Sequence, residues 1–469
     1  MEDTISKEII EAKRKGVTDK EIGEKYGVNL KFIEKVITKE TGINISSPLL
    51  LKKRINKLKP KDFQIECNSV WSFKSRGNWA THNGQYRGNW SPYIPRNIIS
   101  KYSKEEDTVL DFFCGAGTTA IESKLLNRNF IGFDINPNAI ELANENINFN
   151  DLEQNKLFSP EIKLEVGDAR KLSQIENSSI DLICAHPPYS NIINYTHNND
   201  SDLSNYNVEE FLIEMEKVAR ESFRVLKDNH YCAILIGDMR KNKNVIPLGF
   251  WTIEKFLSSG FKIKELIIKR QHNCKTTGFW YKNSIKYNFL LLAHEYLVVF
   301  EKTKDILNTK LIRKFDNNVK FENLNLDKGI ELESKTVWIF NNENWIKNTI
   351  SNLIGRYSNN GYCIYKEKEK IKDNIDILIT FFSNDFYKNL KTMLNRINTE
   401  GIFVVICEDY REDNNLLYSQ AIEIEEKLRD IKDIKIKEIV IISIENGKCA
   451  NTNDNLEITH KYLLIYKKS

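Results

Sequence analysis

A glycine-rich turn after a short apolar run is the first feature of the 469-residue chain that could bind a ligand. Residues 109–113 are mostly apolar, β-branched or aromatic, which favours a buried strand. Gly115 and Gly117 interrupt the run, and Thr118 or Thr119 can cap a following helix. A strand, a glycine turn and a helix N-terminus bring backbone N–H groups and a positive dipole end to one point. The pattern predicts a site for a nucleotide-like ligand.

Two carboxylates follow the next two predicted strands. Residues 129–135 form the second strand, with Asp134 at its carboxyl end, and residues 162–166 form the third, which runs into Asp168. In a doubly wound sheet, an acid at the end of the second strand reaches the diol of a ribose. The ligand is therefore expected to contain a nucleoside.

A fourth apolar run, residues 180–185, leads into the tetrad His186-Pro187-Pro188-Tyr189. Taken in order, and each at a strand end, the glycine turn, the two carboxylates and this tetrad resemble the S-adenosylmethionine-dependent DNA amino-methyltransferases. These enzymes methylate adenine at N6 or cytosine at N4. The resemblance extends over about half of the chain, and it implies S-adenosyl-L-methionine as cofactor and duplex DNA as substrate.

The resemblance also implies which residues hold the cofactor. The first motif of the family contains an acid, an aromatic residue and two glycines, and its later motifs supply a ribose-binding acid and an acid near the adenine. Residues 86–102 resemble the family's tenth motif, which packs against the methionine part of the cofactor. The positions that match are Asp111, Phe113, Gly115, Gly117, Thr118, Asp134, Asp168, Trp90 and Pro92.

The same resemblance makes His186, Pro187, Pro188 and Tyr189 the catalytic residues. The exocyclic amine of a base is a poor nucleophile, because its lone pair is delocalised into the ring. Hydrogen-bond acceptors on the amine, from the first tetrad side chain and the Pro187 carbonyl, localise that lone pair toward the methyl group. The prolines stiffen the loop and lack competing N–H donors, while Tyr189 stacks on a base flipped out of the duplex. Orientation of the amine is then much of the catalysis.

His186 departs from the family, which usually carries Asp, Asn or Ser at this position. A neutral imidazole has one acceptor nitrogen, so His186 can serve only while unprotonated, and activity is expected to fall below about pH 6.5. The alternative is that His186 is structural and the enzyme is weakened. Because the residue is atypical, it does not discriminate adenine N6 from cytosine N4.

Residues 1–45 predict three short helices. Counted from Asp19, a small residue stands at the fifth position (Gly23) and a glycine at the ninth (Gly27), as in the helix-turn-helix of DNA-binding proteins. The alternative is a three-helix packing or protein-contact module. On the first interpretation, a DNA groove would meet Asn29, Lys31 and Lys35.

The second half of the catalytic region is predicted to close the sheet with a hairpin of residues 261–268 and 290–300. Between those strands, residues 269–288 interleave basic and aromatic side chains, which suits a nucleic-acid contact; an ordinary solvated hairpin loop is the alternative. The polar insert 191–207 follows the tetrad and could close over the flipped base. The candidates for DNA contact in the hairpin are Arg270, Lys275, Trp280 and Lys282.

Residues 303–469 echo the catalytic region in the same order, which suggests an internal repeat. The glycine turn and both later carboxylates fall in a stretch that the second copy lacks, so we expect it to bind no cofactor. Target recognition or an intramolecular version of a dimer contact is its expected role. The main matching stretches are 180–183 with 375–378, 238–240 with 409–411, and 294–302 with 460–468.

The composition is that of an ordinary soluble globular protein, with 41% hydrophobic and 29% charged residues. A formal charge of +4 does not by itself establish a nucleic-acid partner. No apolar run reaches the roughly 18 residues of a membrane span, and the first residues do not read as a signal peptide. The eight cysteines form no C-x-x-C pair, so we expect reduced thiols in the cytoplasm and no metal site.

These observations predict an α/β protein with a doubly wound, Rossmann-like methyltransferase sheet. Its expected parts are a helix-turn-helix module (1–45), a basic linker (46–61), the catalytic domain (62–302) and a degenerate methyltransferase-like repeat (303–469). The resemblance implies a site-specific DNA methyltransferase of a restriction–modification or defence system, monomeric or homodimeric, with a restriction endonuclease as a further partner. The alternatives are an RNA or protein methyltransferase, or a DNA-binding regulator that has lost its activity.

Overall fold

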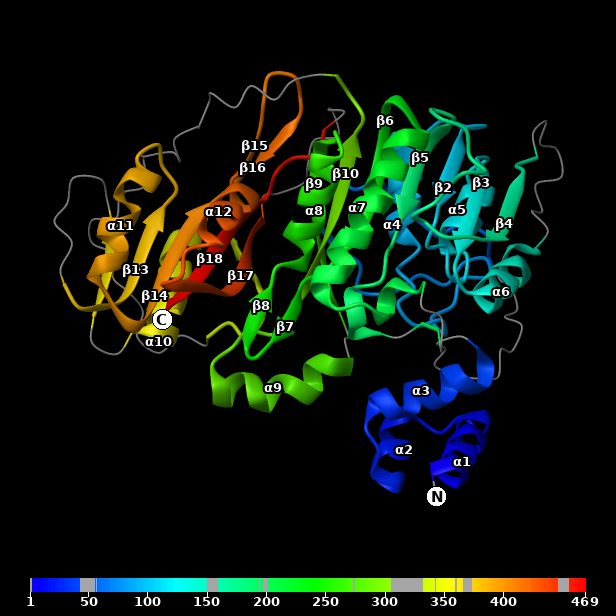
Figure 1. Cartoon of the computed structure of the whole chain (residues 1–469), viewed down its shortest axis with the longest axis horizontal. Helices are drawn as coiled ribbons and strands as arrows, with labels where there is room; N and C mark the ends of the chain where they lie inside the picture. The colour runs from blue at the N-terminus through cyan, green and yellow to red at the C-terminus, as the bar shows by residue number, and fades with distance from the viewer. Residues whose placement is uncertain are drawn as a thin grey trace.

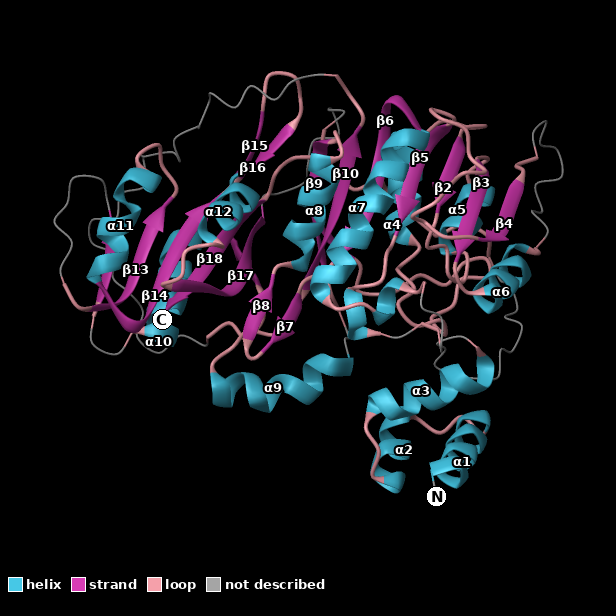
Figure 2. Ribbon diagram, viewed as in Figure 1, coloured by secondary structure: helices cyan, strands magenta, loops and turns pink. Residues whose placement is uncertain are grey.

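The computed structural model describes residues 2–42, 55, 57–149, 159–193, 195–196, 201–272, 275–304, 332–341, 343–358, 361–365, 373–445 and 455–469. Figure 1 shows two sheets side by side, with a small helical module below them in that view. Figure 2 shows helices packed against both sheets. Among the helices that the structure describes, none combines the length and apolar composition that a membrane span requires.

The first sheet has eight described strands in the order β1-β9-β10-β6-β5-β2-β3-β4. Neighbours run parallel, except that β10 is antiparallel to both β6 and β9. The order reverses between β2 and β5, which makes the sheet doubly wound and confirms the predicted fold class. The strands are β1 (Val70–Ser72), β2 (Thr108–Asp111), β3 (Asn129–Asp134), β4 (Ile162–Val166), β5 (Ile180–Ala185), β6 (Leu226–Ile236), β9 (Lys262–Arg270) and β10 (His294–Glu301).

Helices cover both faces of this sheet. Successive side chains of a strand point to opposite sides, and apolar side chains on both sides are buried under helices. Val109 and Leu182 pack with the face that carries α4, α5 and α6, whereas their neighbours Leu110 and Ile183 pack with the face under α7 and α8. β5 is buried along its whole length, as expected for a central parallel strand. The helices are α4 (Tyr93–Tyr102), α5 (Thr118–Leu125), α6 (Pro137–Ile147), α7 (Val208–Val225) and α8 (Leu248–Ser258).

The second sheet follows the strand order and strand directions of the first as far as it extends, in the order β11-β17-β18-β14-β13-β12. β18 is antiparallel between β17 and β14, as β10 is between β9 and β6. In the described part of the chain, nothing corresponds to β3 and β4. The strands are β11 (Val337–Asn341), β12 (Tyr362–Tyr365), β13 (Ile375–Phe381), β14 (Ile397–Cys407), β17 (Ile434–Glu445) and β18 (His460–Lys468), with helices α10 (Trp345–Tyr357), α11 (Phe386–Arg396) and α12 (Gln420–Leu428).

Two small antiparallel ribbons complete the parallel between the sheets. β7 (Met239–Lys241) pairs with β8 (Asn244–Ile246), and β15 (Asp409–Arg411) pairs with β16 (Leu417–Ser419). Each ribbon follows the long strand beside the antiparallel one, β6 in the first sheet and β14 in the second. The arginine of each ribbon reaches the other sheet.

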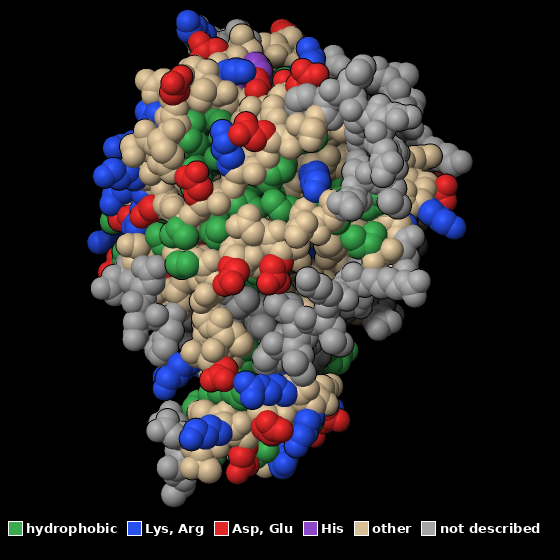
Figure 3. Space-filling view, turned by 90° about the vertical axis from the view of Figure 1, so that its right-hand side faces the viewer, with side chains coloured by type: hydrophobic (Ala, Val, Ile, Leu, Met, Phe, Trp, Pro, Cys, Tyr) green, Lys and Arg blue, Asp and Glu red, His purple; other side chains and the backbone are tan. Residues whose placement is uncertain are grey.

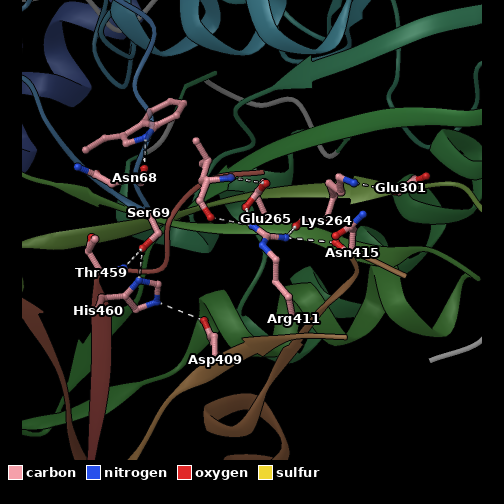
Figure 4. A network of polar contacts seen from close by, with 12 residues as sticks. Asn68, Ser69, Lys264, Glu265, Glu301, Asp409, Arg411, Asn415, Thr459 and His460 are labelled. Atoms are coloured by element: carbon pink, nitrogen blue, oxygen red, sulfur yellow. Dashed lines mark hydrogen bonds and ion pairs between the residues drawn. The ribbon is translucent and has the colours of Figure 1, made fainter. Parts of the chain in front are cut away.

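Polar contacts between the two sheets come in reciprocal pairs. Arg411 of the second sheet's ribbon binds the buried Glu265 of β9 (Figure 4), and Arg240 of the first ribbon binds the buried Glu438 of β17. A contact that is repeated in both directions has the form of an isologous dimer interface.

Two buried histidines repeat the same reciprocity. Nδ1 of His460 lies 2.7 Å from Oγ of Ser69, and Nδ1 of His294 lies 2.9 Å from Oγ1 of Thr336. Figure 4 shows the first of these contacts beside the Arg411–Glu265 pair. These buried histidines thus find hydrogen-bond partners on the opposite side of the interface between the sheets.

The N-terminal module consists of α1 (Glu2–Arg14), α2 (Asp19–Tyr26) and α3 (Leu30–Thr41). Thr18 caps α2 with a complete capping box, Gly27 ends it in the left-handed conformation, and the Asn29 side chain caps α3. A Cβ at Gly23 would lie 3.0 Å from the Val28 carbonyl oxygen, so the chain crosses closely there, as a small residue permits.

The module packs directly on the glycine turn and on α6. Arg87 forms ion pairs with both Asp19 and Glu34, and the Asn136 side chain donates to the Gly42 carbonyl at 2.7 Å. The apolar cluster between them joins Ile9, Ile10, Ile22, Ile33, Val36 and Ile37 to Tyr86, Ala116, Ala139 and Leu142.

Two local predictions were wrong. The stretch predicted as a hairpin loop between the two closing strands contains a helix, α9 (Lys275–Tyr287). Its large side chains Trp280, Tyr281 and Ile285 are exposed, so the helix lacks the apolar stripe that would identify it. The cap of α5 is Gly117 in the left-handed conformation and not a threonine side chain.

Substitution of Arg411 by alanine should lower the free energy of unfolding by about 3–5 kcal/mol, because Glu265 would remain as a buried, unpaired carboxylate. Denaturant unfolding of the full chain measures this. The matched control is Arg14→Ala, which breaks an exposed pair with Glu40 and should cost less than about 1 kcal/mol. Equal reductions in both variants would show that the Arg411–Glu265 pair does not hold the sheets together.

Candidate active site

A cavity lies at the carboxyl ends of β2, β3, β4 and β5, and the strand order reverses between β2 and β5. Its empty volume is about 740 Å³ with the open mouth included. It receives residues from both sides of the reversal, which is where open α/β sheets bind ligands. Of the predicted residues, those that line the cavity are Trp90, Asp111, Phe113, Gly115, Asp134, Asp168, His186 and Pro188, whereas Pro92, Gly117, Thr118, Pro187 and Tyr189 do not.

Two positions of the glycine-rich turn, 115 and 117, require glycine. Gly115 has φ +48°, and a Cβ there would lie 2.9 Å from Cε1 of Tyr86. Gly117 has φ +80° and would meet Ala143 at 3.1 Å. The Gly115 amide donates to Oδ2 of Asp134 at 2.9 Å, so the turn is tied to the end of β3.

Asp111 and Asp134 are carboxylates held by short local hydrogen bonds. Asp111 accepts from the Thr119 hydroxyl at 2.6 Å and from the Phe113 amide at 2.9 Å, and Asp134 accepts a second amide hydrogen from Asn136. Burial raises the pKa of Asp111 to about 7 and the pKa of Asp134 to about 6. A ligand that brings hydrogen-bond donors or positive charge would stabilise both ionised forms.

Asp168 is fixed from its far side by Arg170. Nη2 of Arg170 lies 2.6 Å from Oδ2, Nε lies 2.9 Å from Oδ1, and Nη1 reaches Glu214 at 2.7 Å. Burial acts to raise the pKa of Asp168, but these hydrogen bonds and the arginine charge outweigh it and lower the pKa. The carboxylate therefore stays ionised at the cavity wall.

The loop that carries Trp90 is anchored by Arg76. Its guanidinium donates to the carbonyls of Asn83, Asn89 and Trp90 at 3.1, 2.6 and 2.6 Å. The anchor places the Trp90 ring in a stack against His186, with ring centroids 5.4 Å apart and an angle of 21° between the planes. Pro92 begins the turn into α4 instead.

A buried carboxylate fixes the preceding aromatic segment over α5. Glu122 is fully buried and accepts from the Trp79 indole at 2.6 Å, and its other oxygen binds Arg96 at 2.7 Å. His82 Nε2 lies 2.7 Å from the same carboxylate. These three partners explain how an acid is tolerated within a core helix.

His186 lies at the cavity wall as a neutral imidazole. Burial lowers its pKa to about 4; the charge of Glu295 opposes this shift, and the charges of Lys269 and Arg76 act in the same direction as burial. The sequence alone predicts a fall in activity below about pH 6.5. With the lowered pKa of His186, this fall is expected near pH 4 instead. Nε2 of His186 lies 2.9 Å from the Tyr189 hydroxyl.

The insert after the tetrad forms part of the cavity wall through Tyr195, Asp202 and Leu203. The Tyr195 ring stacks on Tyr86 with centroids 6.2 Å apart. At Gly88, which has φ +73°, a Cβ would lie 1.8 Å from the Tyr195 hydroxyl oxygen. Sequence reasoning missed Tyr86 and Gly88, since no spacing rule links them to a partner about a hundred residues later.

Six of the seven predicted DNA-contacting residues lie on α3, on its N-terminal cap or on α9. Lys35 is exposed on α3, on the side away from the buried Ile33 and Val36, whereas the Asn29 side chain is engaged as the helix cap. On α9, Trp280 is 47% exposed and Lys282 is exposed. The side chains of Lys31 and Lys275 lie outside the described residues.

Both helices lie on the same side of the molecule, below the sheets in Figure 1. Arg270, the last residue of β9, is half-buried. Figure 3 shows the three-helix module as a lobe at the foot of the molecule, where basic and acidic side chains alternate on the visible face.

Comparison with known families identifies the class. Residues 103–272 match the family model described as methyltransferase domain, and residues 11–145 match the model described as DNA methylase. The chain thus carries an S-adenosylmethionine-dependent methyltransferase domain. Within that class, residues 11–145 are similar to the DNA methylases.

Individual relatives match shorter stretches. Type II methyltransferase M.BglI of Bacillus subtilis is 32% identical over a stretch that covers 25% of this chain and 36% of the relative. Type II methyltransferase M1.MboII of Moraxella bovis is 40% identical over a stretch that covers 17% of this chain and 32% of the relative. A ribosomal protein L11 methyltransferase of Clostridium botulinum is 32% identical over 26% of this chain and 49% of its own. The chain spans about a third to a half of the length of these relatives. A solved S-adenosylmethionine-dependent methyltransferase from Methanosarcina mazei aligns with 44% of this chain and 98% of its own, at 17% identity and a TM-score of 0.32.

Replacement of Asp134 by alanine should weaken binding of S-adenosylmethionine by about tenfold or more, because it removes a half-buried acceptor and the partner of the Gly115 amide. Isothermal titration calorimetry measures the change. The control is Glu165→Ala, which removes an exposed carboxylate from the neighbouring strand β4 and should leave affinity unchanged. Unchanged binding by the Asp134 variant would remove this residue from the cofactor site.

Proposed function

We propose that the chain methylates the exocyclic amino group of adenine (N6) or cytosine (N4) in duplex DNA, with S-adenosyl-L-methionine as methyl donor. The observation that carries the proposal is the meeting of His186 and the acids of β2 and β3 in one cavity of a methyltransferase-type sheet. The DNA methylase family match and the names of the two Type II methyltransferase relatives support the choice of DNA.

The chemistry of the cavity wall fits this cofactor. Asp134 offers acceptor oxygens at the position where a doubly wound sheet meets a ribose diol, and Asp168 offers a fixed carboxylate farther along the same edge. Asp111 and the Trp90 ring would hold the methionine part. When bound, the cofactor supplies the methyl group.

The residues of the tetrad act on the amine that receives the methyl group. His186, neutral at physiological pH, accepts a hydrogen bond from the amine, and the Pro187 carbonyl accepts another. These acceptors draw the amine lone pair out of the base ring and orient it, which is a large part of the catalysis. Trp90 restrains the imidazole from its other face through the ring stack.

Access to the amine requires that the base leave the duplex. Tyr189 stacks on the extruded base in this proposal, and its ring is held against Gly237, where a Cβ would lie 2.8 Å from Cε2. The insert with Tyr195 closes the cavity over the base. Helices α3 and α9 present Lys35, Trp280 and Lys282 toward the phosphate backbone and the bases, which combines charge with stacking.

The second sheet is, in this proposal, a copy of the first that has lost its cofactor half. The matching strand orders and the reciprocal arginine–glutamate pairs support a duplication. Phe381 ends β13 where His186 follows β5, so the copy lacks an acceptor at this point. The copy acts as a built-in partner that occupies the interface of a second subunit.

A modification role in a restriction–modification system, with a cognate endonuclease as partner, belongs to the same proposal. It is supported by the designation of the relatives as Type II methyltransferases. The match to a ribosomal protein methyltransferase makes protein the second substrate to test. Incorporation of labelled methyl groups into duplex DNA, RNA and protein, measured in parallel, separates these substrates.

His186→Ala should lower methyl transfer to DNA by at least about a hundredfold, because the amine loses its acceptor, while cofactor affinity is retained. Labelled S-adenosylmethionine measures transfer and calorimetry measures binding. The matched control is His230→Ala, an exposed histidine on β6 of the same sheet. Turnover of the His186 variant at the wild-type rate would rule out the assignment.

The pH profile tests the same residue. Because burial lowers the pKa of His186 to about 4, the neutral acceptor persists as the pH falls and is lost only near that value. With saturating S-adenosylmethionine, which stabilises the ionised forms of Asp111 and Asp134, turnover of the wild type should stay level from about pH 8 to about pH 5. A fall centred near pH 6.5 under these conditions would contradict a neutral His186.

Reversal of two lysine charges on the exposed face of α3, Lys35→Glu with Lys39→Glu, should weaken DNA binding and reduce its salt dependence. The slope of log affinity against log salt concentration should change by about one for each phosphate that the variant no longer neutralises. Fluorescence anisotropy at several salt concentrations measures both quantities. The control, Lys432→Glu with Lys435→Glu, makes the same change in net charge at exposed positions of the second domain. An equal effect of the two pairs would exclude α3 as a specific contact.

A further inference from the structure

Three side chains form a hydrogen-bonded chain that ends at His186. Nζ of Lys269 lies 2.7 Å from Oε2 of Glu295, whose Oε1 accepts from the Tyr189 hydroxyl at 2.9 Å. The Tyr189 oxygen in turn lies 2.9 Å from Nε2 of His186. Lys269 lies on β9 and Glu295 on β10, so both come from strands well outside the cofactor half of the sheet.

The direction of the hydrogen bonds follows from the charge of Glu295. Burial acts to raise its pKa, but the Lys269 ammonium, the neighbouring His186 and hydrogen bonds from Lys269 and Gln271 together hold the pKa at about 2. An ionised carboxylate can only accept hydrogen bonds. Tyr189 has a single hydroxyl proton, which burial and the nearby carboxylate keep in place by raising its pKa, and that proton is committed to Glu295.

The Tyr189 oxygen must therefore accept the hydrogen bond from His186. The donor is Nε2, so the proton of the neutral imidazole resides on Nε2 and the lone pair on Nδ1. Within the described part of the chain, Nδ1 of His186 makes no hydrogen bond. It remains available to a ligand in the cavity that the imidazole lines.

We propose that Glu295 and Lys269 are positioning residues that select the Nε2–H tautomer of His186, and that Nδ1 is the atom that accepts the substrate amine hydrogen. This inference rests on the proposed function for the identity of the amine. The requirement for one tautomer is specific to histidine, because the acceptor oxygens of aspartate, asparagine and serine do not depend on a tautomer.

The second sheet lacks the counterparts of Glu295 and Tyr189. At the position of Glu295, one residue into the antiparallel strand, β18 carries Lys461, which pairs with Glu408. Asn384 stands at the position that corresponds to Tyr189. Within the described residues, the hydrogen-bonded chain therefore occurs only in the sheet that has the cavity.

The second sheet nevertheless holds the strand that carries Glu295. His294, the preceding residue, binds Oγ1 of Thr336 through Nδ1, and its Nε2 lies 3.0 Å from the Tyr296 hydroxyl, which donates to the buried Asp238. The strand end is thus fixed on both sides of Glu295, which keeps its carboxylate within reach of Tyr189.

The test compares three variants in single-turnover methyl transfer. Glu295→Ala frees the Tyr189 proton to point at Nε2, which stabilises the wrong tautomer and should lower the rate about tenfold. Tyr189→Phe removes the hydroxyl and leaves both tautomers accessible, and it should lower the rate about threefold. The double variant should recover to the level of Tyr189→Phe, because the misdirected donor is gone.

Such a recovery separates tautomer selection from support of the fold. If Glu295 merely packs the site, the double variant turns over no faster than Glu295→Ala, and that result would overturn the proposal. The matched control is Glu301→Ala, which removes a carboxylate from the other end of the same strand. This control should leave the rate unchanged. The cofactor affinity should be unchanged in all of the variants.

Nitrogen-15 NMR of histidine-labelled protein reads the tautomer without any turnover. The His186 signals, assigned by their absence in His186→Gln, should show Nε2–H in the wild type and a shift toward Nδ1–H in Glu295→Ala. An Nδ1–H tautomer in the wild type would refute the proposal. The expected signals without methyl transfer to any substrate would support the tautomer selection and refute the proposed function, so the two failures are distinguishable.

Discussion

The reversal of strand order between β2 and β5 is the constraint on which the rest of the molecule depends. Because β3 and β4 extend the sheet on one side and β6, β10 and β9 on the other, the loops after β2 and β5 diverge and leave a crevice at the strand ends. Asp111 and Gly115 line it from one side and His186 from the other. One topological feature thus brings the predicted cofactor residues and the tetrad together. The helices on both faces bury the parallel strands that position them.

The second sheet shows what remains when that feature is absent. It keeps the strand order from β11 to β12, but within the described residues it has no strands beyond β12 to open a crevice. Its buried polar groups serve the interface instead: Glu438 accepts from Arg240, and His460 binds Ser69. Buried ionic pairs add little net stability compared with apolar packing, yet they are costly to break. Their main effect is therefore to fix how the two sheets are placed against each other, and they add little to the stability of the interface.

The sequence predicts the parts of the site that depend on local pattern. Asp134 ends an apolar run and Asp168 follows an alternating one, and both patterns identify strands. Thr18 and Asn29 cap helices by rules that involve only a few neighbouring residues. Glu295 lies 106 residues from Tyr189, and no local pattern links the two. The helix α9 escapes prediction because its exposed Trp280 and Tyr281 do not mark a buried face. Predictions therefore failed where a residue's role is set by a distant partner or by solvent.

In the proposed mechanism, a histidine acceptor must be neutral and must hold its proton on a defined nitrogen, and the structure meets these two requirements separately. Burial keeps the imidazole neutral by lowering its pKa, and the fixed carboxylate of Glu295 determines, through Tyr189, which nitrogen holds the proton. An aspartate in the same place would set a second negative charge near Glu295 in a poorly solvated site, which would raise the pKa of one carboxyl group and protonate it. The neutral ring avoids this repulsion. The departure from the usual Asp, Asn or Ser is thus compatible with the surroundings that this chain has built, because Glu295 and Lys269 give the histidine a defined acceptor.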